Sequence, residues 1–306
     1  MISFRYRDRG TGIHKLNPLT KLVWLISIFV LALIFNHPLY LLLLFLSTLP
    51  LVIAAKVWRE WAASMRFALY FSLAIIVVNT LVSYHGSHIL YQAPFRLPVM
   101  GIPTITLEAM VFGLGMALRL LAVISAFTII TFTVHPDDMM LAMLKMKLPY
   151  KSVLVTSLSS RFVPTLIEDI ERISDVQRSR GLELDKGNLA RRIKNYVAII
   201  VPLLSNSLDR AIQVAEAMES RAFSSGSKRT FYKEIKLSKS DAPALVGSLL
   251  PLVLGIFMRW QQYGTYQYYP TLGKISLYSF ELSMLVLLVF LVASIAFLAL
   301  LRSRIE

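Results

Sequence analysis

Two short motifs of one form, a serine and an arginine followed by a small residue, occur forty-one residues apart in this chain. They are Ser179-Arg180-Gly181 and Ser220-Arg221-Ala222. The planar guanidinium of arginine can pair with a carboxylate through two hydrogen bonds and keeps its charge on partial burial. A cation at the carboxyl end of a helix is also stabilised by about 0.3 to 1 kcal/mol, so either arginine alone fits a purely structural role. Because the motif is repeated, we favour a shared role in binding a partner protein.

A third arginine, Arg119, lies near the middle of the apolar run from Leu107 to Thr133. An ionisable side chain inside a membrane span costs at least about 2.5 to 3.5 kcal/mol, so we expect it to face protein or water. Glu108 lies on the same helical face but about three turns away, too far for a direct ion pair on a straight helix. A structural polar anchor and a functional site are both open for Arg119.

Other kinds of chemistry find little support in the residue types. His85 and His88 could supply two metal ligands, but a metal site normally needs three or four, and no Asp or Glu near them in the sequence completes the set. The chain contains no cysteine and no phosphate-binding loop of the form Gly-x-x-x-x-Gly-Lys-Ser/Thr. No nucleophile, base and orienting residue share a local motif. We therefore expect a non-catalytic chain with no metal or cofactor of its own.

The composition is typical of a membrane protein. Of 306 residues, 56% are hydrophobic, and the mean hydropathy is +0.62. A helix needs roughly 20 apolar residues to cross a bilayer, with about 17 as the lower limit. The turn signal Asn36-His37-Pro38 predicts that the first two apolar runs form a tight helical hairpin. Six runs reach or nearly reach the spanning length, the fifth being short: 19–35, 39–55, 67–83, 107–133, 242–257 and 275–301.

The distribution of Lys and Arg predicts the orientation of these spans, because cytoplasmic loops carry an excess of both. With six alternating spans, one side collects twenty-eight of the thirty-two and the other collects three, while Arg119 lies inside a span. The N- and C-termini are therefore predicted to be cytoplasmic. The net charge of +14 is explained by these loops, and we expect no nucleic-acid partner.

The segment 135–241 is charged, contains no run long enough to span a bilayer, and holds more than half of all Lys and Arg. We therefore divide the chain into N-terminal membrane helices at 1–134 with four spans, a cytoplasmic helical segment at 135–241, and a C-terminal membrane hairpin at 242–306 with two spans.

Two long amphipathic helices are predicted in the cytoplasmic segment, because apolar residues recur there at steps of three and four. The first begins near Pro164. Its other face carries charged residues: Glu168, Asp169, Glu171 and Arg172. The apolar positions are Val163, Leu166, Ile167, Ile170, Ile173 and Val176 in the first helix, and Leu204, Leu208, Ala211, Ala215 and Met218 in the second.

The ends and the small residues of these helices make two further predictions. Gly181 suits the left-handed turn that closes many helices, whereas Ala222 does not, so we expect the second helix to end differently from the first. Ser207, Ala211 and Ala215 place a small residue at every fourth position. This spacing either allows the two helices to cross closely or reflects only the helix propensity of alanine.

Several short motifs, in this order, resemble those of the transmembrane (T) component of energy-coupling factor (ECF) transporters, the importer family that includes cobalt, biotin and shared vitamin modules. The motif around Arg221 departs from the family pattern, which usually has Gly and Tyr at the positions where this chain has Ala222 and Phe223. The matching stretches are His14-Lys15-Leu16-Asn17-Pro18-Leu19-Thr20-Lys21, Ala117-Leu118-Arg119-Leu120, Arg161-Phe162-Val163-Pro164, Gln177-Arg178-Ser179-Arg180-Gly181 and Ala217-Met218-Glu219-Ser220-Arg221-Ala222-Phe223.

The resemblance implies an all-α polytopic membrane protein in a prokaryotic cell membrane, acting as the energy-coupling scaffold of an ABC-type importer. It implies that two coupling helices cross and that Arg180 and Arg221, with their flanking residues, enter grooves on two ATPase subunits that bind ATP and Mg. Motion of the ATPases would pass to a small substrate-binding membrane (S) subunit, which releases a vitamin or a transition-metal ion inward. Arg119 would be an internal organiser.

Two other classes of protein are alternatives to this function. A secondary transporter would show paired broken spans and several intramembrane charges, but the sequence has one such arginine and no convincing inverted repeat. An intramembrane enzyme would have to use Arg119 and the histidines at 85 and 88.

Overall fold

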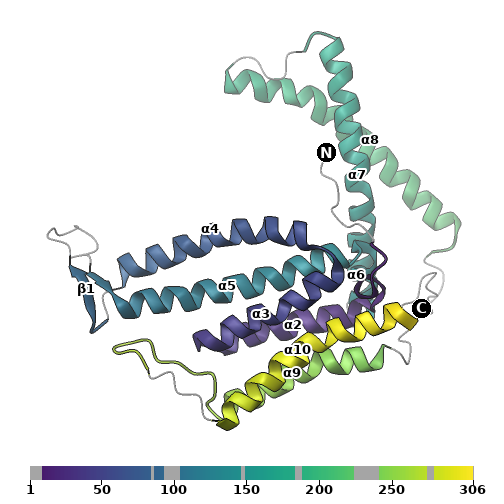
Figure 1. The fold of residues 1–306 in the computed structure, drawn as a ribbon. Helices are drawn as coiled ribbons and strands as arrows, with labels where there is room; N and C mark the ends of the chain where they lie inside the picture. Colours follow the sequence, from purple (N-terminus) through teal and green to yellow (C-terminus); the bar gives the residue numbers. More distant parts are fainter. Residues whose placement is uncertain are drawn as a thin grey trace. The chain divides into compact units, whose positions relative to one another are not determined.

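The computed structural model of the chain describes residues 9–83, 86–92, 104–145, 149–182, 188–223, 241–273 and 279–305. These residues form α-helices and one two-stranded hairpin (Figure 1). Contacts divide the chain into two compact units. We call Met1–Met139 with Lys236–Glu306 the bundle unit and Met140–Ile235 the crossing-helix unit.

The bundle unit consists of long helices around a central one. Helix α5 packs against α2, α3 and α4, and the α9–α10 pair packs against α2 and α3 (Figure 1). Its core is aliphatic and aromatic, with Trp24, Ile28, Leu31, Leu44 and Val292 almost fully buried. The helices are α1 (Gly12–Lys15), α2 (Pro18–Ile34), α3 (Pro38–Ala55), α4 (Trp58–Val82), α5 (Leu107–Thr133), α9 (Ala242–Trp260) and α10 (Ser279–Ile305), while α6 (Pro136–Lys145) lies at the unit boundary.

The predicted hairpin between the first two apolar runs is confirmed. Helix α2 ends at Ile34 and α3 begins at Pro38. The proline occupies the first turn of α3, where its missing N–H leaves no bond unmade, and the side chain of His37 accepts a hydrogen bond from the Leu39 N–H at 3.2 Å. At the start of α2, Asn17 caps the N–H of Leu19 in the same way at 3.0 Å.

Six helices of the described chain are long and apolar enough to cross a membrane by length and composition, but they are not the predicted six. Helix α2, which packs within the bundle, is not among the six, because its 17 residues only just meet the lower limit of the spanning length. The stretch Arg192–Ser220 is long and apolar enough to span a membrane, which contradicts the expectation that 135–241 contains no run of spanning length. Only 6% of its apolar window is buried. The prediction considered only unbroken runs of apolar residues, whereas an amphipathic helix can have a high mean hydropathy although charged residues interrupt the run.

The third predicted span, 67–83, is part of a longer helix. Helix α4 begins at Trp58, so most of the expected loop between the second and third spans is helical. The chain reverses instead at Lys56, whose left-handed conformation (φ 59°) ends α3. The apolar count located only the spanning part, because helices continue past the bilayer wherever polar residues still favour the helical state.

Between α4 and α5, strands β1 (Ile89–Gln92) and β2 (Thr104–Thr106) pair antiparallel. No strand was predicted between these two spans. The expected spans 19–35, 39–55, 107–133, 242–257 and 275–301 each fall largely on one observed helix. The all-α polytopic fold class is confirmed.

The crossing-helix unit contains α7 (Tyr150–Ser179) and α8 (Leu189–Ser220), which cross and contact each other (Figure 1). Ala142, Val153, Asp169 and Ile199 are its buried residues among those described, and many apolar side chains stay exposed. Two helices alone cannot bury an apolar face as wide as this one.

Candidate functional site

The predicted binding arginines each occupy the first position after a long helix. Arg180 follows α7, the N–H of Gly181 donates to the Arg178 carbonyl at 2.9 Å, and the N–H of Leu182 donates to the Gln177 carbonyl at 3.0 Å. Gly181 has φ 86°. This pair of bonds around a left-handed residue is the Schellman motif, which satisfies carbonyls that a helix end would leave unpaired.

Helix α8 ends in the same motif, which overturns the expectation that it would end differently. The N–H of Ala222 donates to Glu219 at 2.8 Å and the N–H of Phe223 donates to Met218 at 3.0 Å. Ala222 itself adopts the left-handed conformation, with φ 54°. A left-handed alanine costs about 1 to 2 kcal/mol. The two hydrogen bonds and the packing of Phe223 on Tyr150, with ring centroids 6.3 Å apart, offset that cost.

All six residues of the two motifs are exposed: Ser179, Arg180, Gly181, Ser220, Arg221 and Ala222. Both serine hydroxyls donate back to their own helices, Ser179 to the Asp175 carbonyl at 2.9 Å and Ser220 to the Ala217 carbonyl at 3.1 Å. The serines therefore complete the helix ends, while the two guanidinium groups remain accessible to an acidic surface.

The contact between α7 and α8 includes a charged pair. Arg210 donates to the carboxylate of Asp169 at 2.9 Å, and the Asp169 side chain is only 11% exposed. The sequence pattern placed Asp169 on the polar outer face, which was wrong, and Arg210 was not singled out. Ala211 and Ala215 are exposed, so these two of the three small residues do not lie in the crossing, whereas Ser207 is half-buried.

Arg119 binds the end of another helix in the bundle unit. Its Nη2 donates to the carbonyl of Phe35 at 3.0 Å and to the Asn36 side chain at 2.8 Å. Phe35 is the carboxyl-terminal cap of α2, where a cation is favoured by the helix dipole. Tyr268 donates to the Asn36 carbonyl at 2.6 Å, and burial raises the pKa of this phenol to about 12, so it stays protonated as a donor. These contacts tie α5 to the end of α2, and the organising role of Arg119 stays a prediction.

At the opposite end of the α2–α5 pair, Lys21 binds helix ends as Arg119 does. The sequence did not predict it as a site residue. The side chain is buried, and its Nζ donates to the Thr133 carbonyl at 2.8 Å and to the His14 carbonyl at 3.2 Å. It thereby joins the carboxyl ends of α5 and α1. Its position in the N-terminal signature resembling the ECF family was the only sequence signal.

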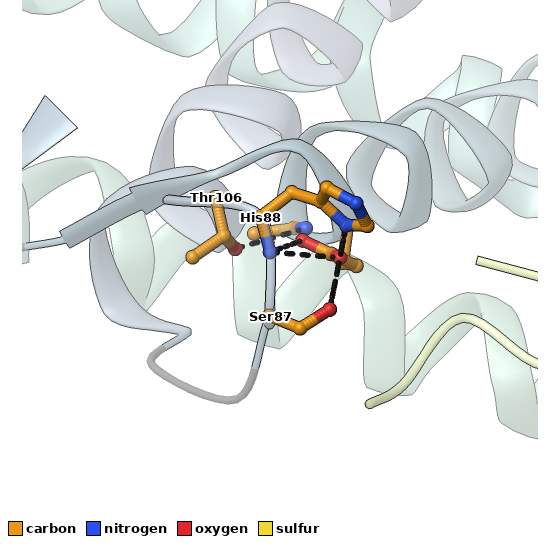
Figure 2. A network of polar contacts seen from close by, with 5 residues as sticks. Ser87, His88 and Thr106 are labelled. Carbon is orange, nitrogen blue, oxygen red and sulfur yellow. Dashed lines mark hydrogen bonds and ion pairs between the residues drawn. The ribbon is translucent and has the colours of Figure 1, made fainter. Parts of the chain in front are cut away.

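A second polar network links the β-hairpin to α5 (Figure 2). The carboxylate of Glu108, 0% exposed, accepts bonds from the Ser87 hydroxyl at 3.0 Å and from the His88 N–H at 3.1 Å, and lies 2.7 Å from His88 Nδ1. Thr106 caps α5 by accepting from the Ala109 N–H. Glu108 is twenty residues from His88 in the sequence, so the sequence distance did not indicate that the two side chains are neighbours. His85 lies outside the described residues, and those described contain no cluster of three metal-ligating side chains.

Comparison with known proteins identifies the family. The family model described as cobalt transport protein (CbiQ) matches residues 10–232, more than half of the chain. The energy-coupling factor transporter transmembrane protein EcfT of Staphylococcus aureus is 30% identical over 267 residues, which is 84% of this chain and 96% of that protein. EcfT of Streptococcus equi is 31% identical over 270 residues, covering 84% and 95% of the two chains. EcfT of Bacillus subtilis is 27% identical over 268 residues, covering 85% and 98%.

These relatives are named as membrane components of transporters, and the matched region contains Arg119, Arg180 and Arg221. The fold agrees, since the described chain is helical with several helices of spanning length. The chain therefore belongs to the CbiQ cobalt transport protein family and is a multi-pass transmembrane (T) component of an energy-coupling factor transporter.

Proposed function

We propose that this chain couples ATP hydrolysis by two ABC-type ATPase subunits to a small substrate-binding membrane subunit, with Arg180 and Arg221 as the docking residues. The observation that carries the proposal is the repeated helix end: two long helices stop in the same hydrogen-bonded motif, each with an exposed arginine at its cap. Two identical guanidinium-bearing ends fit a partner that itself has two copies of an acidic groove. ATP and Mg bind to those partners.

The direction of the helices in the pair supports docking at two separate points. Tyr150, the first residue of α7, packs on Phe223, just beyond α8, and Gln177 near the end of α7 donates to the Ala198 carbonyl in the first third of α8 at 3.3 Å. The helices therefore run in opposite directions, and Arg180 and Arg221 lie at opposite ends of the pair. A dimer of ATPases could hold one end on each subunit.

The apolar face of α8 supports a second partner, the S subunit. Its side chains recur at helical spacing and are each roughly half exposed, so the crossing-helix unit does not cover them. An exposed stripe of this length marks a surface for an apolar partner or the membrane. The stripe consists of Ile193, Val197, Ile200, Leu204, Leu208 and Ile212.

The proposal assigns α7 and α8 to the cytoplasmic side of a prokaryotic cell membrane, together with both termini. The excess of Lys and Arg in 135–241 supports this side. On this assignment α8 lies at the membrane surface with its stripe toward apolar partners, and does not cross the bilayer. The transported vitamin or metal ion is selected by the S subunit. No observation favours a secondary transporter or an intramembrane enzyme.

The test is co-purification of the chain with its ATPases, comparing wild type with Arg180→Glu, Arg221→Glu and the double variant. Arg178→Glu is the matched control, because Arg178 has the same charge, lies two residues from Arg180 and is 59% exposed. Breaking one partner of an interfacial charge pair costs about 2 to 5 kcal/mol, so we expect each single variant to weaken binding and the double variant to lose both ATPases and uptake. Full binding and uptake in the double variant would contradict the proposal.

A further inference from the structure

The ion pair between α7 and α8 lies equally far, in residues, from the docking arginine at the end of each helix. Arg180 follows Asp169 by eleven residues, and Arg221 follows Arg210 by eleven residues. Eleven residues of α-helix span about 16 Å. Each docking arginine therefore lies the same distance beyond the paired residue of its own helix.

The side chains around the ion pair repeat with the same offset. Five buried or half-buried positions of α7 correspond one by one to five half-buried positions of α8 that lie forty-one residues later. Since the helices run in opposite directions, a local two-fold axis through the ion pair would exchange the two helices and the two docking arginines. The positions are Phe162, Leu166, Asp169, Ile173 and Gln177 in α7, and Leu203, Ser207, Arg210, Val214 and Met218 in α8.

Among these five pairs of positions, Asp169 and Arg210 bring two charged side chains together, and Gln177 adds a neutral hydrogen bond to the Ala198 carbonyl. The ion pair is the stronger of the two constraints on register. Apolar contacts are non-directional, so a seam of Leu, Ile, Val and Met side chains allows the helices to slide or rotate against each other. A buried charge must keep its partner, because separating the two leaves an uncompensated ion, and polar residues at helix crossings are known to specify register in this way.

We propose that Asp169 and Arg210 are positioning residues that form the pivot of the crossing and hold Arg180 and Arg221 at equal distances from it. Because the two arms are equally long, rotation of the two helices against each other about this point moves the two docking ends by equal amounts. The consequence for transport rests on the proposed function, but the geometry is a property of this chain alone and can be measured without partners.

The test measures the distance between two spin labels, one on each helix, by pulsed electron paramagnetic resonance. The chain has no cysteine, so Val176→Cys with Ala217→Cys gives two labelling sites. Both positions are exposed, and each lies seven residues beyond the paired residue of its helix. The purified full-length chain in lipid nanodiscs should give one narrow distance peak.

Asp169→Asn, which keeps shape but removes the charge, should lose the narrow peak, and the exchange Asp169→Arg with Arg210→Asp should recover it. Asp169→Leu with Arg210→Met should keep the protein folded, because apolar residues often replace a buried ion pair without loss of stability, yet still broaden the distribution. Asp175→Asn is the control, since its pair with Arg178 is exposed and 3.9 Å long, and it should leave the peak unchanged.

A narrow peak that persists in Asp169→Asn or in the apolar double variant would overturn the proposal. ATP-driven uptake by the assembled complex should fall in Asp169→Asn and recover in the charge exchange. If Arg180→Glu with Arg221→Glu left ATPase binding intact, the docking proposal would fail while the distance result would stand, so the two failures are distinguishable.

Discussion

Lys21 and Arg119 each bind the carboxyl end of the helix that carries the other. Lys21 on α2 donates to Thr133, the last residue of α5, and Arg119 on α5 donates to Phe35, the cap of α2. The helices are antiparallel neighbours, and each cation meets the partial negative charge of the adjacent helix end. These two cations are in this way paired with backbone carbonyls at helix ends, which have no partner within their own helix.

Replacing either cation should destabilise the bundle. Lys21→Met or Arg119→Met leaves a buried carbonyl without its donor, which costs about 1 to 3 kcal/mol. The contacts lie at opposite ends of the helix pair, so the two losses should add within about 0.5 kcal/mol in the double variant. Thermal unfolding of the detergent-solubilised chain measures the effect, with Lys15→Met as a control because Lys15 is exposed. An unchanged midpoint in both single variants would show that these bonds do not stabilise the fold.

Replacing glycine by alanine at one helix end and alanine by glycine at the other should change the stability of the two ends in opposite directions. Gly181→Ala forces a side chain into the left-handed conformation (φ 86°), although nothing lies within 4 Å of the new methyl group, and should destabilise that end by about 1 kcal/mol or more. Ala222→Gly relieves the same strain and should stabilise the end of α8 by about 1 kcal/mol. Amide hydrogen exchange of the peptides around Leu182 and Phe223 reports both. Effects of the same sign would contradict the common geometry of the two ends.

The sequence predicted the membrane helices because the hydropathy and length of a span are properties of one continuous stretch of residues. It did not predict where α4 begins, since polar residues continue a helix without changing its apolar count. The prediction for Ala222 failed for a related reason. The preference for glycine in the left-handed conformation is worth about 1 to 2 kcal/mol, and the two hydrogen bonds with the packing of Phe223 offset it.

The candidate site was predicted only where its residues form a local motif. Arg180 and Arg221 each end a helix, so their position was evident in the sequence. The partners of Asp169 and Arg119 come from other helices, and Phe35 is eighty-four residues from Arg119. An amphipathic pattern assigns a charged residue to the outer face by default, so it missed a carboxylate whose cation lies on the neighbouring helix.

The network around Glu108 predicts that Gly86 cannot carry a side chain. A Cβ atom at this position would lie 2.5 Å from a carboxylate oxygen of Glu108 and 2.6 Å from the Thr106 side chain. Gly86→Ala should therefore displace the β-hairpin from α5 and expose Glu108. We expect faster cleavage of the hairpin by protease in Gly86→Ala. Gly247→Ala serves as a control because its added methyl group would make only ordinary van der Waals contacts, the nearest at 3.4 Å, and equal cleavage rates in the two variants would contradict this packing.

His37 predicts a dependence of stability on pH. Burial lowers the pKa of this imidazole, while the charge of Glu281 opposes the shift. Its Nδ1 accepts the Leu39 N–H bond that caps α3, which requires a neutral ring. Because the folded pKa lies below the unfolded value of 6.5, the unfolded chain takes up the proton first as pH falls. The stabilisation is thus complete above pH 6.5 and decreases as pH falls toward the folded pKa. Thermal unfolding between neutral and mildly acidic pH should show this decrease, and His37→Asn, which keeps a capping acceptor, should reduce it. An identical pH profile in wild type and His37→Asn would assign the dependence to another group.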